Sequence, residues 1–160
     1  MTNQQLISKL SKVADNEMLL AEAYTWQSGE IRGKEPAWVA SVLTRMATNV
    51  LLRATMVTEV LSCLGCSHRC AGVREGLLAC GNDPAAMYRF DREKVRETIG
   101  LCEEVLESGL GEPEGGCLVK EVVRELCKEE ESQCDMLGQL LNLAEHRDSD
   151  PSASRTNSEG

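Results

Sequence analysis

Residues 126–137 read LCKEEESQCDML, and they lie at the centre of a long helical pattern. Side chains suited to an interior recur around them at steps of three and four residues, the spacing that places residues on one face of an α-helix. The positions of this stripe are Val119, Val123, Leu126, Glu130, Cys134, Leu137 and Leu141. We therefore expect a long helix here that ends at the polar segment HRDSDPSASRTNSEG of residues 146–160, which is too polar to order itself by burial.

Three further segments carry the same spacing. The first runs from about residue 4 to 31 and is ended by Gly33 and Pro36. The second contains the stripe Val39, Leu43, Met46, Val50, Met56, Val60 and Cys63. The third begins at Pro84, after the capping residues Asn82 and Asp83, and continues to the glycine-rich turn at 109–116.

The pattern weakens between residues 66 and 81, and a connection of this length can span a helical bundle from end to end. Two long helices, one long connection and two more long helices predict an all-α four-helix bundle with a single crossover. The length of 160 residues fits one domain. We expect the bundle over residues 1–145 and a disordered polar tail over 146–160.

Composition and charge narrow the function. Aromatic residues make up only 3% of the chain, which favours helices over sheets. The net charge of −9 and the pI of about 4.8 argue against nucleic-acid binding, which needs clustered Lys and Arg. The N-terminus has no signal-peptide pattern, and no apolar run is long enough to span a bilayer. We expect a cytoplasmic protein without a membrane or nucleic-acid partner.

Several short segments resemble those of bacterioferritins, in the same order and at nearly the family's spacing, and the resemblance runs from about Leu6 to Ala144. They are Asn16-Glu17 followed by Tyr24, then NDPAAMYRFD at 82–91, RETIGLCEE at 96–104 and LCKEEESQCDML at 126–137. The resemblance implies the ferritin-like form of the four-helix bundle, with the long crossover between its second and third helices. It also implies an oligomeric shell for iron storage and a di-iron ferroxidase centre.

The resemblance also shows that most of this centre is missing. The family places one Glu on each of two helices and a Glu-x-x-His pair on each of the other two. The matching positions here are Glu17, Asn49, Leu52, Val95, Glu130 and Gln133. Val and Leu supply no metal donor, and Asn and Gln are weak neutral ligands for iron. We therefore expect no di-iron ferroxidase and no catalytic residues.

Two consequences concern the remaining residues of this set. Glu17 and Glu130 would be interior polar groups hydrogen-bonded to Asn49 and Gln133, because buried carboxylates need partners. The family holds haem between paired subunits through a Met, and Val50 stands at that position, so we expect no haem.

The eight cysteines suggest a second kind of chemistry. The segment CLGCSHRC of residues 63–70 ends the second helix, and Cys117 begins the fourth, at the same end of the bundle. The candidate metal ligands are Cys63, Cys66, His68, Cys70 and Cys117, which could bind zinc or an iron–sulfur cluster. Reduced, half-buried thiols are the simpler interpretation.

Three other cysteines, Cys102, Cys127 and Cys134, would face the interior. Thiolates there could hold a soft ion such as Cu(I), but packing as small apolar groups is the interpretation we favour. Cys80, near the far end of the crossover, joins neither group and is expected to be free.

These observations predict a bacterioferritin-like subunit for iron homeostasis and storage, with an incomplete ferroxidase centre and no enzymatic activity. It would form a homo-oligomer or assemble with an active bacterioferritin-like paralogue, and its metal ions would be iron or zinc. The alternative is a cysteine-rich bundle that binds zinc, copper or a cluster, or that senses oxidation through its thiols.

Overall fold

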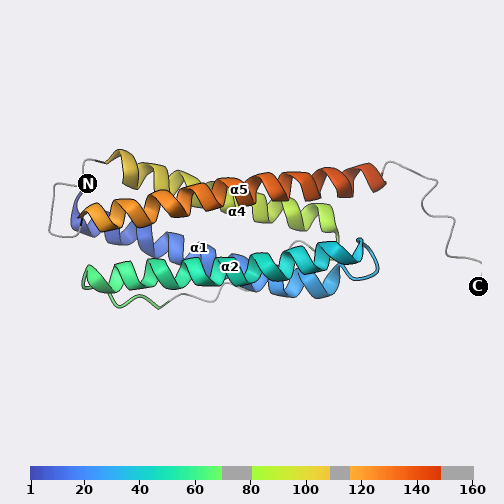
Figure 1. The fold of residues 1–160 in the computed structure, drawn as a ribbon, viewed down its shortest axis with the longest axis horizontal. Coiled ribbons are helices and arrows are strands. Elements are labelled where there is room, and N and C mark those ends of the chain that lie inside the picture. Colours follow the sequence, from blue (N-terminus) through green and yellow to red (C-terminus); the bar gives the residue numbers. More distant parts are fainter. Residues whose placement is uncertain (70–80, 109–115, 149–160) are drawn as a thin grey trace, which may run out of the picture.

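The computed structural model describes residues 1–69, 81–108 and 116–148, with only the backbone described at 116, 117 and 148. This part of the chain forms four long α-helices: α1 (Asn3–Glu30), α2 (Ala37–Cys63), α4 (Pro84–Glu107) and α5 (Gly116–Asp148). Helices α1 and α2 pack as one antiparallel hairpin, and α4 and α5 pack as a second (Figure 1). The predicted all-α four-helix bundle is thus confirmed.

The direction of the helices explains the long connection. Helix α2 ends at the end of the bundle where α1 and α5 begin, whereas α4 starts at the opposite end (Figure 1). Cys63 and Pro84 therefore lie at opposite ends of the bundle, as the crossover prediction requires.

Local sequence fixes most helix ends. Thr2 and Gln5 form a capping box at the start of α1, in which each side chain accepts a hydrogen bond from the other residue's backbone N–H. At the start of α4, the carboxylate of Asp83 accepts hydrogen bonds from two backbone N–H groups, and Pro84 follows at the first helical position.

Helix α2 ends at a glycine. Gly65 has a φ of 79°, a conformation that other residues adopt only at a cost. The turn lets the N–H of Cys66 bond back to the carbonyl of Leu61 at 2.9 Å, which satisfies a carbonyl at the helix end. The backbone thereby reverses direction directly before Cys66.

Helix α5 continues three residues into the segment that we expected to form the tail. His146 and Arg147 lie in its last turn, where positive charge favours the helix dipole. Arg147 also pairs with Glu35 at 2.7 Å, which fastens this end of α5 to the α1–α2 turn. Residues 149–160 lie outside the described part of the chain.

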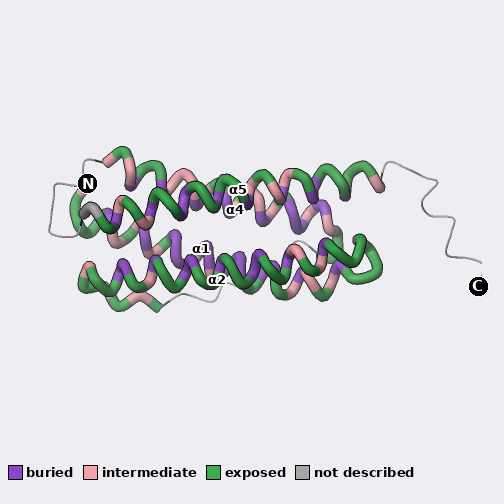
Figure 2. Tube along the Cα trace, viewed as in Figure 1, coloured by how far each residue is buried: buried purple, intermediate pink, exposed green. Residues whose placement is uncertain are grey.

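The apolar interior of the described residues has two large clusters, one toward each end of the bundle, and a small third one around Leu19 and Ala23. Buried side chains face the space between the helices (Figure 2). One cluster contains Leu20, Tyr24, Val50, Val95 and Leu137, and the other contains Val13, Val57, Cys102, Val123 and Cys127. Between these two groups, each helix has a buried polar residue, namely Glu17 on α1, Arg53 on α2, Thr98 on α4 and Glu130 on α5. This polar layer is the candidate site.

The register of α2 differs in part from the predicted one. Met56 is 44% exposed and Cys63 is also exposed, so neither belongs to the interior stripe. The buried positions beyond Val50 are Arg53, Ala54, Val57, Val60 and Leu61. The interior face of α2 therefore passes through an arginine.

Candidate functional site

A buried ion-pair centre lies in the middle of the bundle. Glu17 of α1 and Glu130 of α5 are both 0% exposed, and Arg53 of α2 is 5% exposed. Arg53 Nε donates a hydrogen bond of 3.0 Å to Glu17 Oε2, and Arg53 Nη2 lies 2.7 Å from Glu130 Oε1. One guanidinium thus connects carboxylates that come from opposite hairpins.

Further hydrogen bonds orient the guanidinium. Arg53 Nη2 donates to Gln133 Oε1 at 2.5 Å, and Gln133 Nε2 donates to the hydroxyl of Tyr24 at 2.7 Å. On the solvent side, Arg53 Nη1 donates a hydrogen bond of 3.4 Å to the exposed carboxylate of Glu129. Arg53 of α2 is therefore held by groups of two other helices, α1 and α5, and the planar fork of its donors suits such an arrangement.

Burial raises the pKa of Glu17 well above its ordinary value, and the charge of Glu130 raises it further, against the opposing effect of Arg53. Burial raises the pKa of Glu130 as well. The interior thus favours the protonated form of both carboxyls, and Arg53 opposes this effect at each of them.

Three buried carboxyl oxygens of the ion-pair centre accept no hydrogen bond from the described residues. Glu17 Oε1 and both oxygens of Glu130 are buried without a hydrogen bond from the described residues. The approach of Arg53 to Glu130 is close enough for an ion pair, although its direction does not make a hydrogen bond. Protonation of one carboxyl, which burial favours, would provide a donor for these oxygens.

Arg53 was not predicted from the sequence, which indicated other partners for the carboxylates of Glu17 and Glu130. Asn49 is exposed and makes no hydrogen bond with Glu17 among the described side chains, and Leu52 is 61% exposed. The expected pairing of Glu17 and Glu130 with Asn49 is therefore wrong, and the guanidinium replaces it. Gln133 does join the centre, through Arg53 rather than through either carboxylate.

The error is one residue in the register of α2. Val50 and Arg53 occupy the interior positions that we assigned to Asn49 and Leu52, and they keep the three-residue spacing. A signal was present in the sequence, because Met46, Val50, Val57 and Leu61 form a stripe that includes position 53. An arginine within an apolar stripe, opposite two interior Glu, indicates a buried ion pair.

The donor set does not fit a pair of iron ions. The guanidinium of Arg53 already lies between Glu17 and Glu130, and its positive charge repels a metal cation. Val95 is 0% exposed and presents an apolar side chain from α4. Val50, the position that we matched to the family's haem ligand, is also 0% exposed and lies inside the bundle. With the register corrected by one residue, the matching position is Leu51, which is 48% exposed and has no sulfur or nitrogen to bind haem iron.

A second buried polar pair lies toward the α1–α2 turn. Asp91 of α4 is 0% exposed, and its carboxylate accepts a hydrogen bond of 2.9 Å from Gln27 of α1. Burial raises the pKa of Asp91 to about 8, with the hydrogen bond of Gln27 opposing the shift. Asp91 was not among the site residues predicted from the sequence.

The candidate thiol site is described only in part. Cys63 is exposed, Cys66 is half-buried, and His68 bonds Asp15 through Nε2 at 3.0 Å. Cys70 lies outside the described residues, and only the backbone of Cys117 is described. Within the part of the chain whose side chains are described, no three His, Cys, Asp or Glu residues are grouped so that they could hold a metal ion.

The interior thiols pack as apolar groups. Cys102 is 0% exposed and Cys127 is 8% exposed, and both belong to the same hydrophobic cluster. Burial raises the pKa of both thiols, and that of Cys102 is raised further by Cys127. Cys134 is partly buried against the other cluster, and Cys80 lies outside the described residues.

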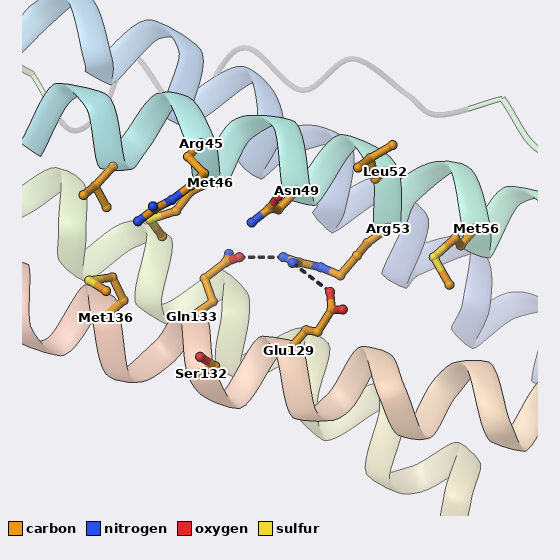
Figure 3. A pocket seen from close by; sticks show the side chains of 11 residues that line it. Arg45, Met46, Asn49, Leu52, Arg53, Met56, Glu129, Ser132, Gln133 and Met136 are labelled. Carbon is orange, nitrogen blue, oxygen red and sulfur yellow. Dashed lines mark hydrogen bonds and ion pairs between the residues drawn. The ribbon is translucent and has the colours of Figure 1, made fainter.

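A groove of about 470 Å³ opens between α2 and α5, directly over the ion-pair centre (Figure 3). Arg53, Gln133 and Glu129 contribute to its lining, together with Val42, Arg45, Met46, Asn49, Leu52, Met56, Ser132 and Met136. The sequence analysis did not predict this groove. It exists because α2 and α5 approach each other much less closely than the helices of either hairpin do.

Comparison with known proteins supports the fold. The structure resembles that of Rhodobacter capsulatus bacterioferritin, with a TM-score of 0.71 and 16% sequence identity over 91% of this chain and 89% of that chain. That bacterioferritin structure has a metal-free dinuclear site and haem iron. No protein-family model and no curated protein matches the sequence. None of the described helices has the length and apolar character needed to cross a membrane. The chain therefore has the ferritin-like four-helix fold of the bacterioferritins.

Proposed function

We propose that this chain is a non-catalytic, bacterioferritin-like subunit that contributes structure, and not ferrous oxidation, to an iron-homeostasis assembly. The observation that carries the proposal is the guanidinium of Arg53 between Glu17 and Glu130. It supplies inside the bundle the positive charge that a metal would otherwise bring to these carboxylates.

The chemistry of the ion-pair centre supports a role without ferrous oxidation. Ferrous oxidation needs metal ligands with open coordination positions, and the interior here offers two carboxyls already engaged with Arg53. The raised pKa of Glu17 favours its neutral form, which attracts a cation less than a carboxylate does. The centre thus favours stability over turnover.

Assembly is the second half of the proposal. We propose a homo-oligomer or a mixed assembly with an active bacterioferritin-like paralogue, in which the paralogue oxidises iron. Trp38 and Leu51 of α2 are 49% and 48% exposed, and large apolar side chains of this kind are common in subunit contacts. Stored iron would be the cargo of the assembly.

The test combines two measurements on the purified full chain. Light scattering gives the particle mass, and absorbance after addition of ferrous iron in air gives the oxidation rate, with an active bacterioferritin as reference. A large particle that oxidises iron no faster than buffer supports the proposal. A monomer, or fast oxidation that is lost in Glu130→Ala, contradicts it.

The alternative proposal is a thiol metal site that involves Cys63, Cys66, His68, Cys70 and Cys117. What favours it is the turn after Gly65, which places Cys66 and His68 on the lining of one small pocket of about 330 Å³. Zinc or a cluster at near one per chain after anaerobic purification, lost in Cys66→Ser and kept in Cys134→Ser, would support it. Metal-free protein would remove it.

A further inference from the structure

The groove between α2 and α5 contains polar side chains that the bundle does not use. Arg45, Asn49 and Ser132 line it, and none of them makes a side-chain hydrogen bond or ion pair within the described part of the chain. Asn49 points from α2 toward Gln133 and Arg53 (Figure 3). The groove therefore offers free donors at its rim and floor.

Charge is distributed unevenly along the groove. Arg53, at the centre, is compensated by Glu17, Glu130 and Glu129. Arg45 lies toward the opposite end of the groove from Glu129 (Figure 3). It has no acidic partner among the described residues, so its guanidinium is a free positive charge. An anionic group is attracted to the Arg45 end and repelled at the Glu129 end.

The walls near Arg45 are apolar and adaptable. Met46 and Met136 lie at the Arg45 end of the groove (Figure 3), and Val42 also contributes to its lining. Thioether side chains fit irregular shapes and make favourable contacts with aromatic rings. The volume of about 470 Å³ lies within the range of roughly 300–1,000 Å³ that is typical of small-molecule pockets.

We propose that the α2–α5 groove binds a small aromatic monocarboxylate, with its carboxylate on Arg45 and Asn49 and its ring between Met46 and Met136. Arg45 and Asn49 are four residues apart on one face of α2, so both can reach the same carboxylate. The ring covers the apolar wall and approaches the ion-pair centre without contacting its carboxyls. This site needs neither iron nor a shell, and so it is independent of the function proposed above.

The test is calorimetric titration of the full chain with 2-naphthoate. We expect saturable binding at one site per chain, weakened about tenfold in Arg45→Gln, the effect expected from loss of a charge-assisted contact. Glu129→Gln should bind a few fold more tightly, because it removes repulsion at the groove. Asn49→Phe, which fills the groove at an exposed position, should bind no naphthoate while its circular dichroism stays unchanged.

The matched control is Arg96→Gln, which removes the same charge from an exposed position on α4, outside the groove. Its affinity for 2-naphthoate should equal that of the unmodified chain, and neutral 2-naphthamide should bind as weakly to the unmodified chain as naphthoate binds to Arg45→Gln. Absence of saturable binding would overturn the proposal. Equal affinities in Arg45→Gln and the unmodified chain, or equal losses in Arg45→Gln and Arg96→Gln, would also overturn it.

Discussion

Arg53 Nε of α2 donates a hydrogen bond of 3.0 Å to Glu17 Oε2 of α1, and both side chains are buried in the middle of the bundle. Ion pairs at this depth lose their hydration, so they persist only where geometry and further partners compensate. Gln133 and Glu130 provide that compensation from α5. The contacts of Arg53 with Glu130 and Gln133 of α5 therefore connect the two hairpins at the level where a metal centre would otherwise connect them.

Removal of the guanidinium should be strongly destabilising. Arg53→Met leaves two buried carboxyls without a counter-charge, and we expect a loss of about 3–5 kcal/mol in the free energy of unfolding. The loss should be larger at pH 8 than at pH 5, because both carboxyls can take up protons at the lower pH. Urea unfolding at both pH values measures it.

The control for this variant is Arg45→Met, on the exposed side of the same helix. Its free energy of unfolding should change by no more than about 0.5 kcal/mol. Equal effects of the two substitutions would mean that Arg53 contributes nothing through its buried partners.

The two carboxyls should substitute for each other. Glu17→Gln or Glu130→Gln alone leaves one carboxylate beside Arg53, and we expect each to cost about 1 kcal/mol. The double variant leaves the buried guanidinium with only the half-exposed Glu129, and should cost about 3 kcal/mol or more. A double-mutant cycle measures the coupling. Strict additivity of the two substitutions would exclude a shared proton and a shared counter-charge.

Asp91 should make the stability of the fold fall as pH rises. Its pKa is raised to about 8 in the folded chain from 3.8, so the folded state keeps a proton that the unfolded chain releases. The folded state therefore binds more protons between these pH values, and stability declines by up to about 1.4 kcal/mol per pH unit. Below pH 3.8 both states are protonated and the effect is absent.

Asp91→Asn removes this dependence, because its amide oxygen still accepts the hydrogen bond of Gln27 and carries no charge. We expect the variant to be more stable than the unmodified chain at pH 8 and similar to it at pH 4. Glu103→Gln, an exposed substitution on the same helix, is the control and should leave the pH profile unchanged. A parallel profile for Asp91→Asn would show that Asp91 is ionised at neutral pH.

The cysteines should separate into fast and slow groups in alkylation with iodoacetamide. Cys63 is exposed and should react within the native state. Cys102 is buried, and burial raises its pKa, so it should react at least about a hundredfold more slowly, after local opening of the bundle. Peptide mass spectrometry over time distinguishes them. Equal rates at native conditions would mean that the interior at Cys102 is open.

Periodicity predicted the helices well because apolar spacing and capping are local properties. The expected start at Pro84 after Asp83 is confirmed, and the first helix runs from Asn3 to Glu30 where 4–31 was expected. The end of α5 was predicted less well, because the contact of Arg147 with Glu35 is tertiary. Local sequence cannot show such a contact.

The candidate site was predicted less completely. The interior placement of Glu17 and Glu130 was anticipated, since both interrupt apolar stripes. The interior placement of Arg53 was not anticipated, because the resemblance to bacterioferritins placed Asn49 and Leu52 inside the bundle. A charged residue is also usually expected to be exposed. A shift of one residue turns a helix by about 100°, which is enough to exchange an interior side chain for a surface one.

The most direct test of the central claim is a crystal structure of the full chain after anaerobic soaking with ferrous iron, with anomalous diffraction measured at the iron edge. We predict no anomalous peak between Glu17 and Glu130 and the guanidinium of Arg53 in contact with both carboxyls. An iron peak between these carboxyls, with Arg53 displaced into the α2–α5 groove, would contradict the account.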